Sequence, residues 1–253
     1  MTCRLSVALV VAALLGTSSQ AGAEVKRVDV ASRSDVGASG YEKIVATVHL
    51  AVDPNDPHNR VIADLDKAPL GPSGRVEFST DLYILRPKDV RRSNGVALID
   101  VPNRGRKLIL NGFDRGGSND PASDADLGDQ FLMRQGFTLV WIGWQFDVRR
   151  EEGLLGISVP AAQGISGIVR ADFTPNNRAT EQTVTDLIGY SPVDPTGTDT
   201  TLTVRDGPLG QAEPVARDSW RLEGNVVKLG AGFEPGRTYE LSYRAARLPI
   251  AGL

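Results

Sequence analysis

The stretch VALIDVPNRGRKLILNGFDRGGSNDP, residues 96–121, joins a short apolar run to a long polar loop. Residues 96–101 are nearly all apolar, which is typical of a strand buried on both faces. The loop places Asn103, Arg104, Gly105, Arg106 and Lys107 directly after the strand and shows no periodicity. Loops of this length are uncommon in compact domains unless they are functional. Two interpretations stay open: the loop builds part of a site, or it is a solvated turn.

The residues that follow the loop predict a helix and a second buried strand. In residues 123–136, Ser123 is a candidate N-cap, Asp126 completes a capping-box-like pair, and Gly136 is a natural stop. Residues 137–144, FTLVWIGW, are a second continuous apolar run. Strand, helix and strand in this order predict a parallel pair with a right-handed crossover. Ligands of open parallel sheets bind beyond the carboxyl ends of the strands, so free N–H groups in the loop would suit a developing oxyanion.

Alternating patterns predict further strands on both sides of this unit. Residues 44–52, IVATVHLAV, and residues 76–85, VEFSTDLYIL, alternate with period two, which indicates half-buried sheet. Between residues 157 and 244 only short strand candidates occur, separated by turn clusters rich in Pro, Gly and Asn. This spacing predicts an antiparallel β layer or a small β-rich insertion.

Composition restricts the function classes. The 253 residues are 41% hydrophobic and 23% charged, as in a globular protein that buries a real core. The net charge of −3 leaves no excess of cations to hold a phosphate backbone, so nucleic acid is not predicted as a partner. Cys3 is the only cysteine, which excludes disulfides, thiol catalysis and Cys-ligated zinc from a mature chain that lacks residues 1–23.

Residues 1–23 are predicted to be a signal peptide. Arg4 precedes an apolar run at residues 5–16, and the segment ends in a small-x-small pattern that predicts cleavage after Ala23. We therefore expect export to the periplasm or secretion. The apolar run is short for a bilayer span, so no membrane span is expected after cleavage, and an uncleaved anchor is the alternative.

The sequence contains no complete catalytic motif. It has no Gly-x-Ser-x-Gly elbow, no phosphate-binding glycine loop and no paired metal-ligand spacing, and we predict neither a cofactor nor a metal. The Asp-rich turn at residues 53–60 lacks the spacing and the bidentate acid of an EF-hand. His49 in a strand and His58 in that turn are interpreted as surface residues. Trp141 and Trp144, on an apolar strand, are interpreted as core, although with Trp220 they could line a pocket.

Several segments taken in order carry a resemblance that covers the chain from about residue 25 to Leu253. They resemble bacterial proteins described as alpha/beta hydrolase domain proteins. The segments are GYEKIVATVHLAVDPNDPHNRVIADLDKAP, VEFSTDLYILRP, NRGRK, GSNDP, FLMRQGFTLVWIGWQFDV and GFEPGRTYELSYRA. The resemblance implies an α/β fold with much β, the N-terminal part of an alpha/beta-hydrolase-like sheet. Residues 24–156 would be the N-terminal half of that domain, and residues 157–253 a β-rich insertion and the lead-in to a missing C-terminal half.

The same resemblance implies an exported, esterase-like enzyme that acts on a small ester-like substrate. Asn103, Arg104 and Gly105 would begin its oxyanion loop. The catalytic serine, acid and histidine would lie beyond Leu253, so a fragment of this kind is expected to be inactive alone. The alternative, from the many period-two segments, is an exported β-rich binding or structural module without catalysis.

Overall fold

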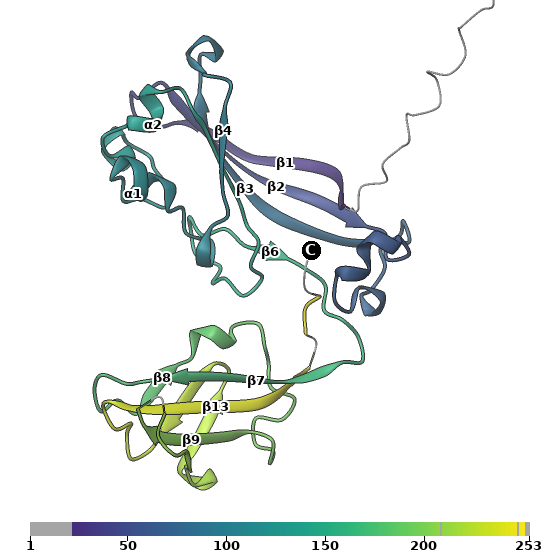
Figure 1. The fold of residues 1–253 in the computed structure, drawn as a ribbon, viewed down its shortest axis with the longest axis vertical. Coiled ribbons are helices and arrows are strands. Elements are labelled where there is room, and N and C mark those ends of the chain that lie inside the picture. The colour runs from purple at the N-terminus through teal and green to yellow at the C-terminus, as the bar shows by residue number, and fades with distance from the viewer. Residues whose placement is uncertain (1–21, 208, 247, 251–253) are drawn as a thin grey trace, which may run out of the picture.

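The computed structural model describes residues 22–250 apart from residues 208 and 247, and of residue 186 only the backbone. The signal peptide predicted for residues 1–23 lies almost wholly outside this part of the chain. The described residues form two lobes, and the last strand of the second lobe leads back toward the first (Figure 1). Ala161 and Pro249 form a β-bridge at this return. No helix in the described part is long and apolar enough to cross a bilayer.

The first lobe is built on one twisted sheet. The alternating segments predicted as strands at residues 44–52 and 76–85 are confirmed as the central strands β2 and β3, which pair antiparallel along their whole length. The two apolar runs are also strands and pair in parallel. In sheet order the strands are β1 (Glu24–Asp35), β2 (Tyr41–Val52), β3 (Val76–Pro87), β5 (Thr138–Ile142) and β4 (Ala97–Asp100), with β6 (Ile157–Ser158) pairing with β3.

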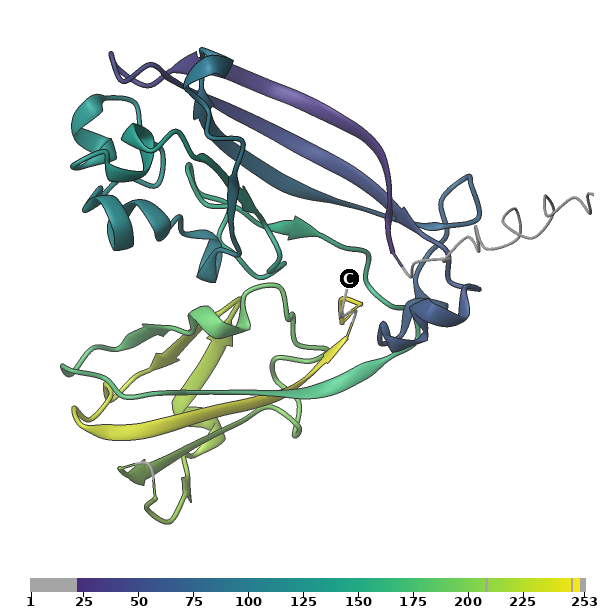
Figure 2. The same ribbon diagram turned by 45° about the horizontal axis from the view of Figure 1, so that its top comes forward.

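The short helices α1 (Ile109–Asp114) and α2 (Phe131–Arg134) and the turn η5 (Asp124–Leu127) cover one face of this sheet, and Figure 2 shows them beside it in teal. The continuous helix predicted for residues 123–136 is wrong. The capping box of Ser123 and Asp126 is present and Gly136 ends the segment, but Gly128 (φ 62°, ψ −131°) and Gln130 (φ 57°) interrupt it. The other helical turns of the first lobe are η1 (Pro57–Val61), η2 (Leu65–Lys67), η3 (Val90–Arg92) and η4 (Asn103–Gly105).

The prediction of an α/β-hydrolase-like fold is wrong. The described chain forms three mostly antiparallel sheets with two short α-helices, and only β4 and β5 pair in parallel. Two continuous apolar runs had indicated strands covered on both faces. Leu98, Leu139 and Leu85 do align on the face that packs against α1 and α2. On the opposite face Ile99 is 61% exposed, because β4 is the last strand of its sheet and no helix covers it there.

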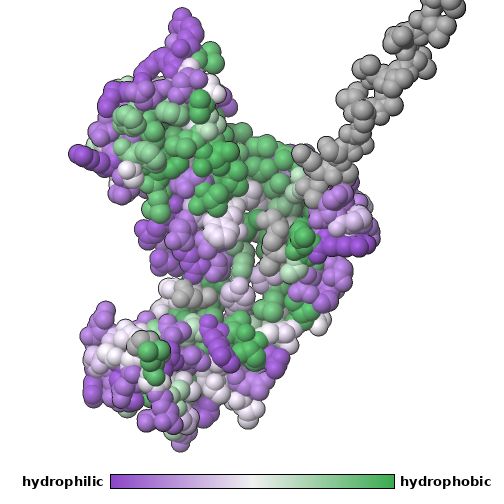
Figure 3. Space-filling model, in the orientation of Figure 1, coloured by the Kyte–Doolittle hydropathy of each residue, from purple (hydrophilic) through white to green (hydrophobic). Residues whose placement is uncertain are grey.

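The two edges of the sheet differ in a way that predicts self-association. Edge strand β1 also exposes Val25, Val28 and Val30, but charged side chains lie between and beside them, including Arg27 and Asp29, which form an ion pair. The opposite edge exposes Val96, Ile99 and Val101, and Figure 3 shows hydrophobic residues gathered on this part of the first lobe. Unpaired apolar edges join other chains, whereas charged edges resist pairing. We therefore expect the protein to self-associate as its concentration rises, and Ile99→Lys to reduce this association.

Sedimentation velocity over a concentration series measures the effect. Val30→Lys is the matched control, because Val30 is a similarly exposed apolar residue on the charged edge strand β1. Equal sedimentation of the wild type and Ile99→Lys would contradict the assignment of the β4 edge as the contact surface.

The second lobe consists of two small antiparallel sheets around an aromatic core, as the short strand candidates after residue 157 predict. Phe173, Phe233 and Tyr239 pack edge-to-face or stacked, with ring centroids 5.0–5.6 Å apart. Trp220 is buried in the same core. One sheet has the order β10 (Glu213–Pro214), β9 (Thr201–Asp206), β13 (Arg237–Ala246), β7 (Ser166–Phe173), and the other β11 (Trp220–Glu223), β12 (Val226–Leu229), β8 (Glu181–Thr183), with turns η6 (Thr185–Leu187) and η7 (Arg217–Ser219).

Candidate binding site

The turn after β4 is pinned to the segment that follows β5. Gly105 has φ 77°, and a Cβ atom there would lie 2.7 Å from the backbone N and O atoms of Leu155. The Leu155 N–H donates to the Gly105 carbonyl at 3.1 Å. Only glycine fits this contact without displacing the backbone. Gly105 is buried, so the loop is not merely a solvated turn.

The three residues predicted to start an oxyanion loop occupy different environments. Asn103 is exposed, and its carbonyl accepts a hydrogen bond from the Arg106 N–H at 3.2 Å. The Arg104 N–H, expected to be free, instead donates to Oε1 of Gln145 at 2.6 Å. The Arg104 guanidinium pairs with Asp147 at 2.5 Å. Arg104 therefore contacts residues 145–147, which follow the carboxyl end of β5, the parallel neighbour of β4. Ligands of open parallel sheets bind beyond this end of the strands.

A cavity of about 780 Å³ lies between the two lobes beside this turn. Its volume is in the range of small-molecule sites, and so is its lining, which is mainly apolar and aromatic with a few polar groups. The first lobe and the returning chain end contribute Ala63, Asp64, Trp144, Gln145, Phe146, Asp147, Ile157, Val159, Leu248, Pro249 and Ile250, and the second lobe contributes Val169, Arg170, Leu187 and Tyr190.

Aromatic side chains connect the lobes across this cavity. Phe146 and Tyr190 meet edge-to-face with their ring centroids 5.2 Å apart. Burial raises the pKa of Tyr190, and the nearby Asp147 carboxylate adds to the increase. Trp144 is 53% exposed and donates from Nε1 to the Pro102 carbonyl at 2.7 Å. The interpretation of Trp144 as core is wrong, whereas Trp141 is fully buried as predicted.

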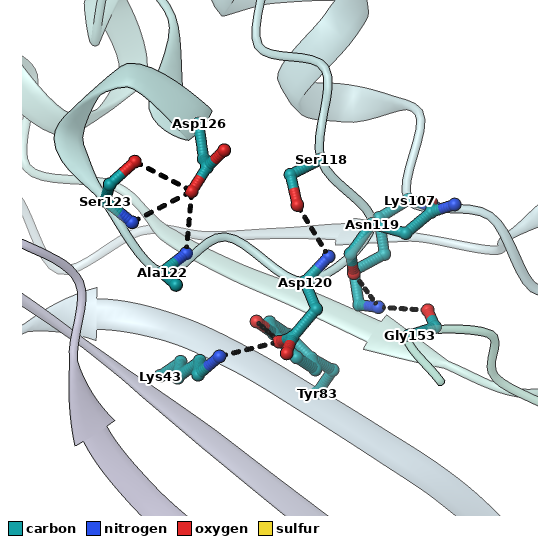
Figure 4. A network of polar contacts seen from close by, with 10 residues as sticks. All are labelled: Lys43, Tyr83, Lys107, Ser118, Asn119, Asp120, Ala122, Ser123, Asp126 and Gly153. Atoms are coloured by element: carbon teal, nitrogen blue, oxygen red, sulfur yellow. Dashed lines mark hydrogen bonds and ion pairs between the residues drawn. The ribbon is translucent and has the colours of Figure 1, made fainter. Parts of the chain in front are cut away.

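Lys107 anchors the rest of the loop inside the first lobe (Figure 4). Lys107 as a whole residue is 3% exposed. Nζ donates to the carbonyls of Asn119 and Gly153 at 2.5 and 2.6 Å and lies 4.2 Å from the centroid of the Tyr83 ring. Burial lowers the pKa of Lys107 to about 8. Because the ammonium donates to protein carbonyls, we interpret Lys107 as a structural residue that connects the loop around Asn119 to the loop around Gly153.

Asp120 completes this polar network. One of its oxygens accepts hydrogen bonds from Lys43 and from the Tyr83 hydroxyl, both at 2.8 Å. Burial acts to raise the pKa of Asp120, but the bonds from Lys43 and Tyr83 outweigh it and lower that pKa overall. The network thus holds residues 107–120 against the sheet, next to the turn whose Arg104 contacts the cavity residues Gln145 and Asp147.

The histidines take no part in this arrangement. His49 pairs with Asp29 at 3.0 Å and His58 with Asp56 at 2.9 Å, and both rings are partly exposed. Within residues 22–250, leaving out the undescribed positions, no three His, Cys, Asp or Glu side chains gather as metal ligands would.

Sequence reasoning missed the cavity residues that lie across from the predicted loop. Gln145 and Asp147 directly follow an apolar strand. The rule that ligands bind beyond the carboxyl ends of parallel strands, which pointed to the loop after residue 101, therefore applies to them as well. Tyr190 carries no such signal, because it comes from the other lobe and reaches the site only through the packing of the two lobes.

Comparison with family models, with curated proteins and with solved structures finds no match to this chain. The resemblance to alpha/beta hydrolase domain proteins therefore stays a prediction from sequence, and the geometry of the site carries the functional argument.

Proposed function

We propose that this protein binds a small, largely apolar molecule in the cavity between its lobes. The cavity itself is the main support for this proposal. It has a volume of about 780 Å³, its lining includes Trp144, Phe146 and Tyr190, and only a few lining residues are polar. Apolar walls supply affinity through burial, and the few polar groups orient the ligand. An aromatic ligand suits the three rings, because aromatic pairs gain further energy from edge-to-face contact.

This function corresponds to the binding module inferred from the strand pattern, and export from residues 1–23 remains part of the proposal. An ester-like ligand is compatible with the cavity. Among the described residues, the His49 ring contacts Arg27 and Asp29 and the His58 ring contacts Asp56, and neither ring bonds to a serine hydroxyl. The hydrogen bonds here therefore do not specifically favour ester hydrolysis.

Titration calorimetry with methyl 2-naphthoate, a neutral aromatic ester, tests the proposal. We expect saturable binding of one ligand per chain. Ala63→Trp should weaken it by about tenfold or more, because Ala63 is exposed at the cavity wall and a tryptophan there fills the space the ligand needs.

Ala125→Trp is the matched control, since Ala125 is an exposed alanine in η5 that does not line the cavity. The control should bind like the wild type. Absence of saturable binding, or equal binding by Ala63→Trp and the wild type, would refute the cavity as the binding site.

A further inference from the structure

A second, smaller recess adjoins the interlobe cavity through Asp147. It has a volume of about 210 Å³, and Asp147 lines both spaces. The first lobe contributes Arg104, Arg106 and Arg149, and the second lobe contributes Thr185 and Ile188. The recess is far smaller than the main cavity, so it suits the head group of a ligand whose body lies in the larger space.

Three guanidinium groups and one carboxylate, that of Asp147, line this recess. Asp147 is engaged by Arg104 at 2.5 Å. Arg149 pairs with Glu151 at 3.2 Å, but both side chains are more than half exposed, and exposed pairs of this kind hold weakly. Arg106 is exposed and has no ion pair with any residue that the structure describes. Two of the three arginines are thus available to an incoming anion.

Guanidinium groups recognise a carboxylate through paired N–H donors in one plane. We propose that the ligand carries a carboxylate attached to its apolar body, with the carboxylate in the arginine recess and the body between Trp144 and Tyr190. Arg106 is the residue that selects the anion. This inference rests on the proposed binding function and specifies its ligand class as aryl or otherwise apolar carboxylates.

The preceding turn explains why Arg106 is placed here. Gly105 fits only as glycine against Leu155, and the Arg106 N–H donates to the Asn103 carbonyl at 3.2 Å. The backbone of Arg106 is therefore held while its side chain stays exposed at the recess.

Titration calorimetry with 2-naphthoate and with its neutral methyl ester tests the inference on the full chain. Binding of 2-naphthoate should be about tenfold tighter or more than binding of the ester, and its advantage should shrink as salt is added. Arg106→Gln should weaken the binding of 2-naphthoate far more than the binding of the ester and so remove most of that advantage. Arg178→Gln is the control, since Arg178 is exposed on the second lobe and lines neither space.

The outcomes separate the two proposals. Equal binding of the acid and the ester, or an equal loss of both in Arg106→Gln, would overturn the carboxylate assignment while leaving the cavity in place. Binding of neither compound would overturn both proposals. Weaker binding of the acid by Arg178→Gln to the same extent as by Arg106→Gln would show a general charge effect and would also refute the recess.

Discussion

Gly128→Ala is expected to destabilise the protein by about 4 kcal/mol, through backbone strain and overpacking together. Gly128 lies between η5 and α2 with φ 62° and ψ −131°, a conformation that essentially only glycine adopts. A Cβ atom there would lie 1.9 Å from the Asp114 carbonyl oxygen and 2.5 Å from the Gly116 nitrogen. The backbone of residues 114–116 or of Gly128 itself would have to shift. Urea unfolding followed by circular dichroism measures the loss.

Gly112→Ala is the matched control for this change. Gly112 lies in α1, in the same cover, and apart from its chain neighbours and the backbone of its own helix no atom lies within 4 Å of the position of an added Cβ. Alanine also favours a helix over glycine by about 0.5–1 kcal/mol. This variant should be as stable as the wild type or slightly more so. Similar losses for both variants would mean that the steric contact at Gly128 does not decide its effect.

The second large effect is a change of stability with pH that depends on Lys107. Its pKa is about 8 in the folded protein and 10.5 ordinarily, so between these values the unfolded chain binds more protons. The free energy of unfolding then rises with pH. From pH 7 to pH 9.5, the wild type should gain about 2 kcal/mol relative to Lys107→Met, which has no proton to bind at this position.

Urea unfolding of both proteins at each pH gives this difference. Lys88→Met is the control: Lys88 is exposed, and its hydrogen bond and attraction to Asp35 raise its pKa. Its difference from the wild type should stay nearly constant up to pH 9.5. A constant difference for Lys107→Met as well would show that the Lys107 ammonium is not desolvated in the folded protein.

The pH effect bears on the candidate site, because Lys107 fixes the loop that begins at Arg104. In Lys107→Met the carbonyls of Asn119 and Gly153 lose their donor. The loop then loses a hydrogen-bonded connection to the segment around Leu155, which also contacts Gly105. The polar network of the first lobe and the interlobe cavity are thereby coupled through the backbone of residues 103–107.

Local sequence determined the strands and the caps. The alternation in residues 44–52 and 76–85 produced β2 and β3, and Ser123 with Asp126 formed the capping box. These features depend on residues a few positions apart, so the pattern is readable without the rest of the chain. The same holds for the two apolar runs at residues 96–101 and 137–144, which contain the parallel pair β4 and β5.

Tertiary structure decided which faces of those elements are buried and where the site lies. An apolar residue such as Ile99 signals burial, but burial needs an element to pack on it, and none of the described elements lies there. The break at Gly128 arises from its contact with Asp114, and the cavity forms only where Tyr190 of the second lobe meets Phe146 of the first. The sequence by itself determined the elements, whereas contacts between distant segments determined their environment, because packing free energy depends on neighbours that no local pattern specifies.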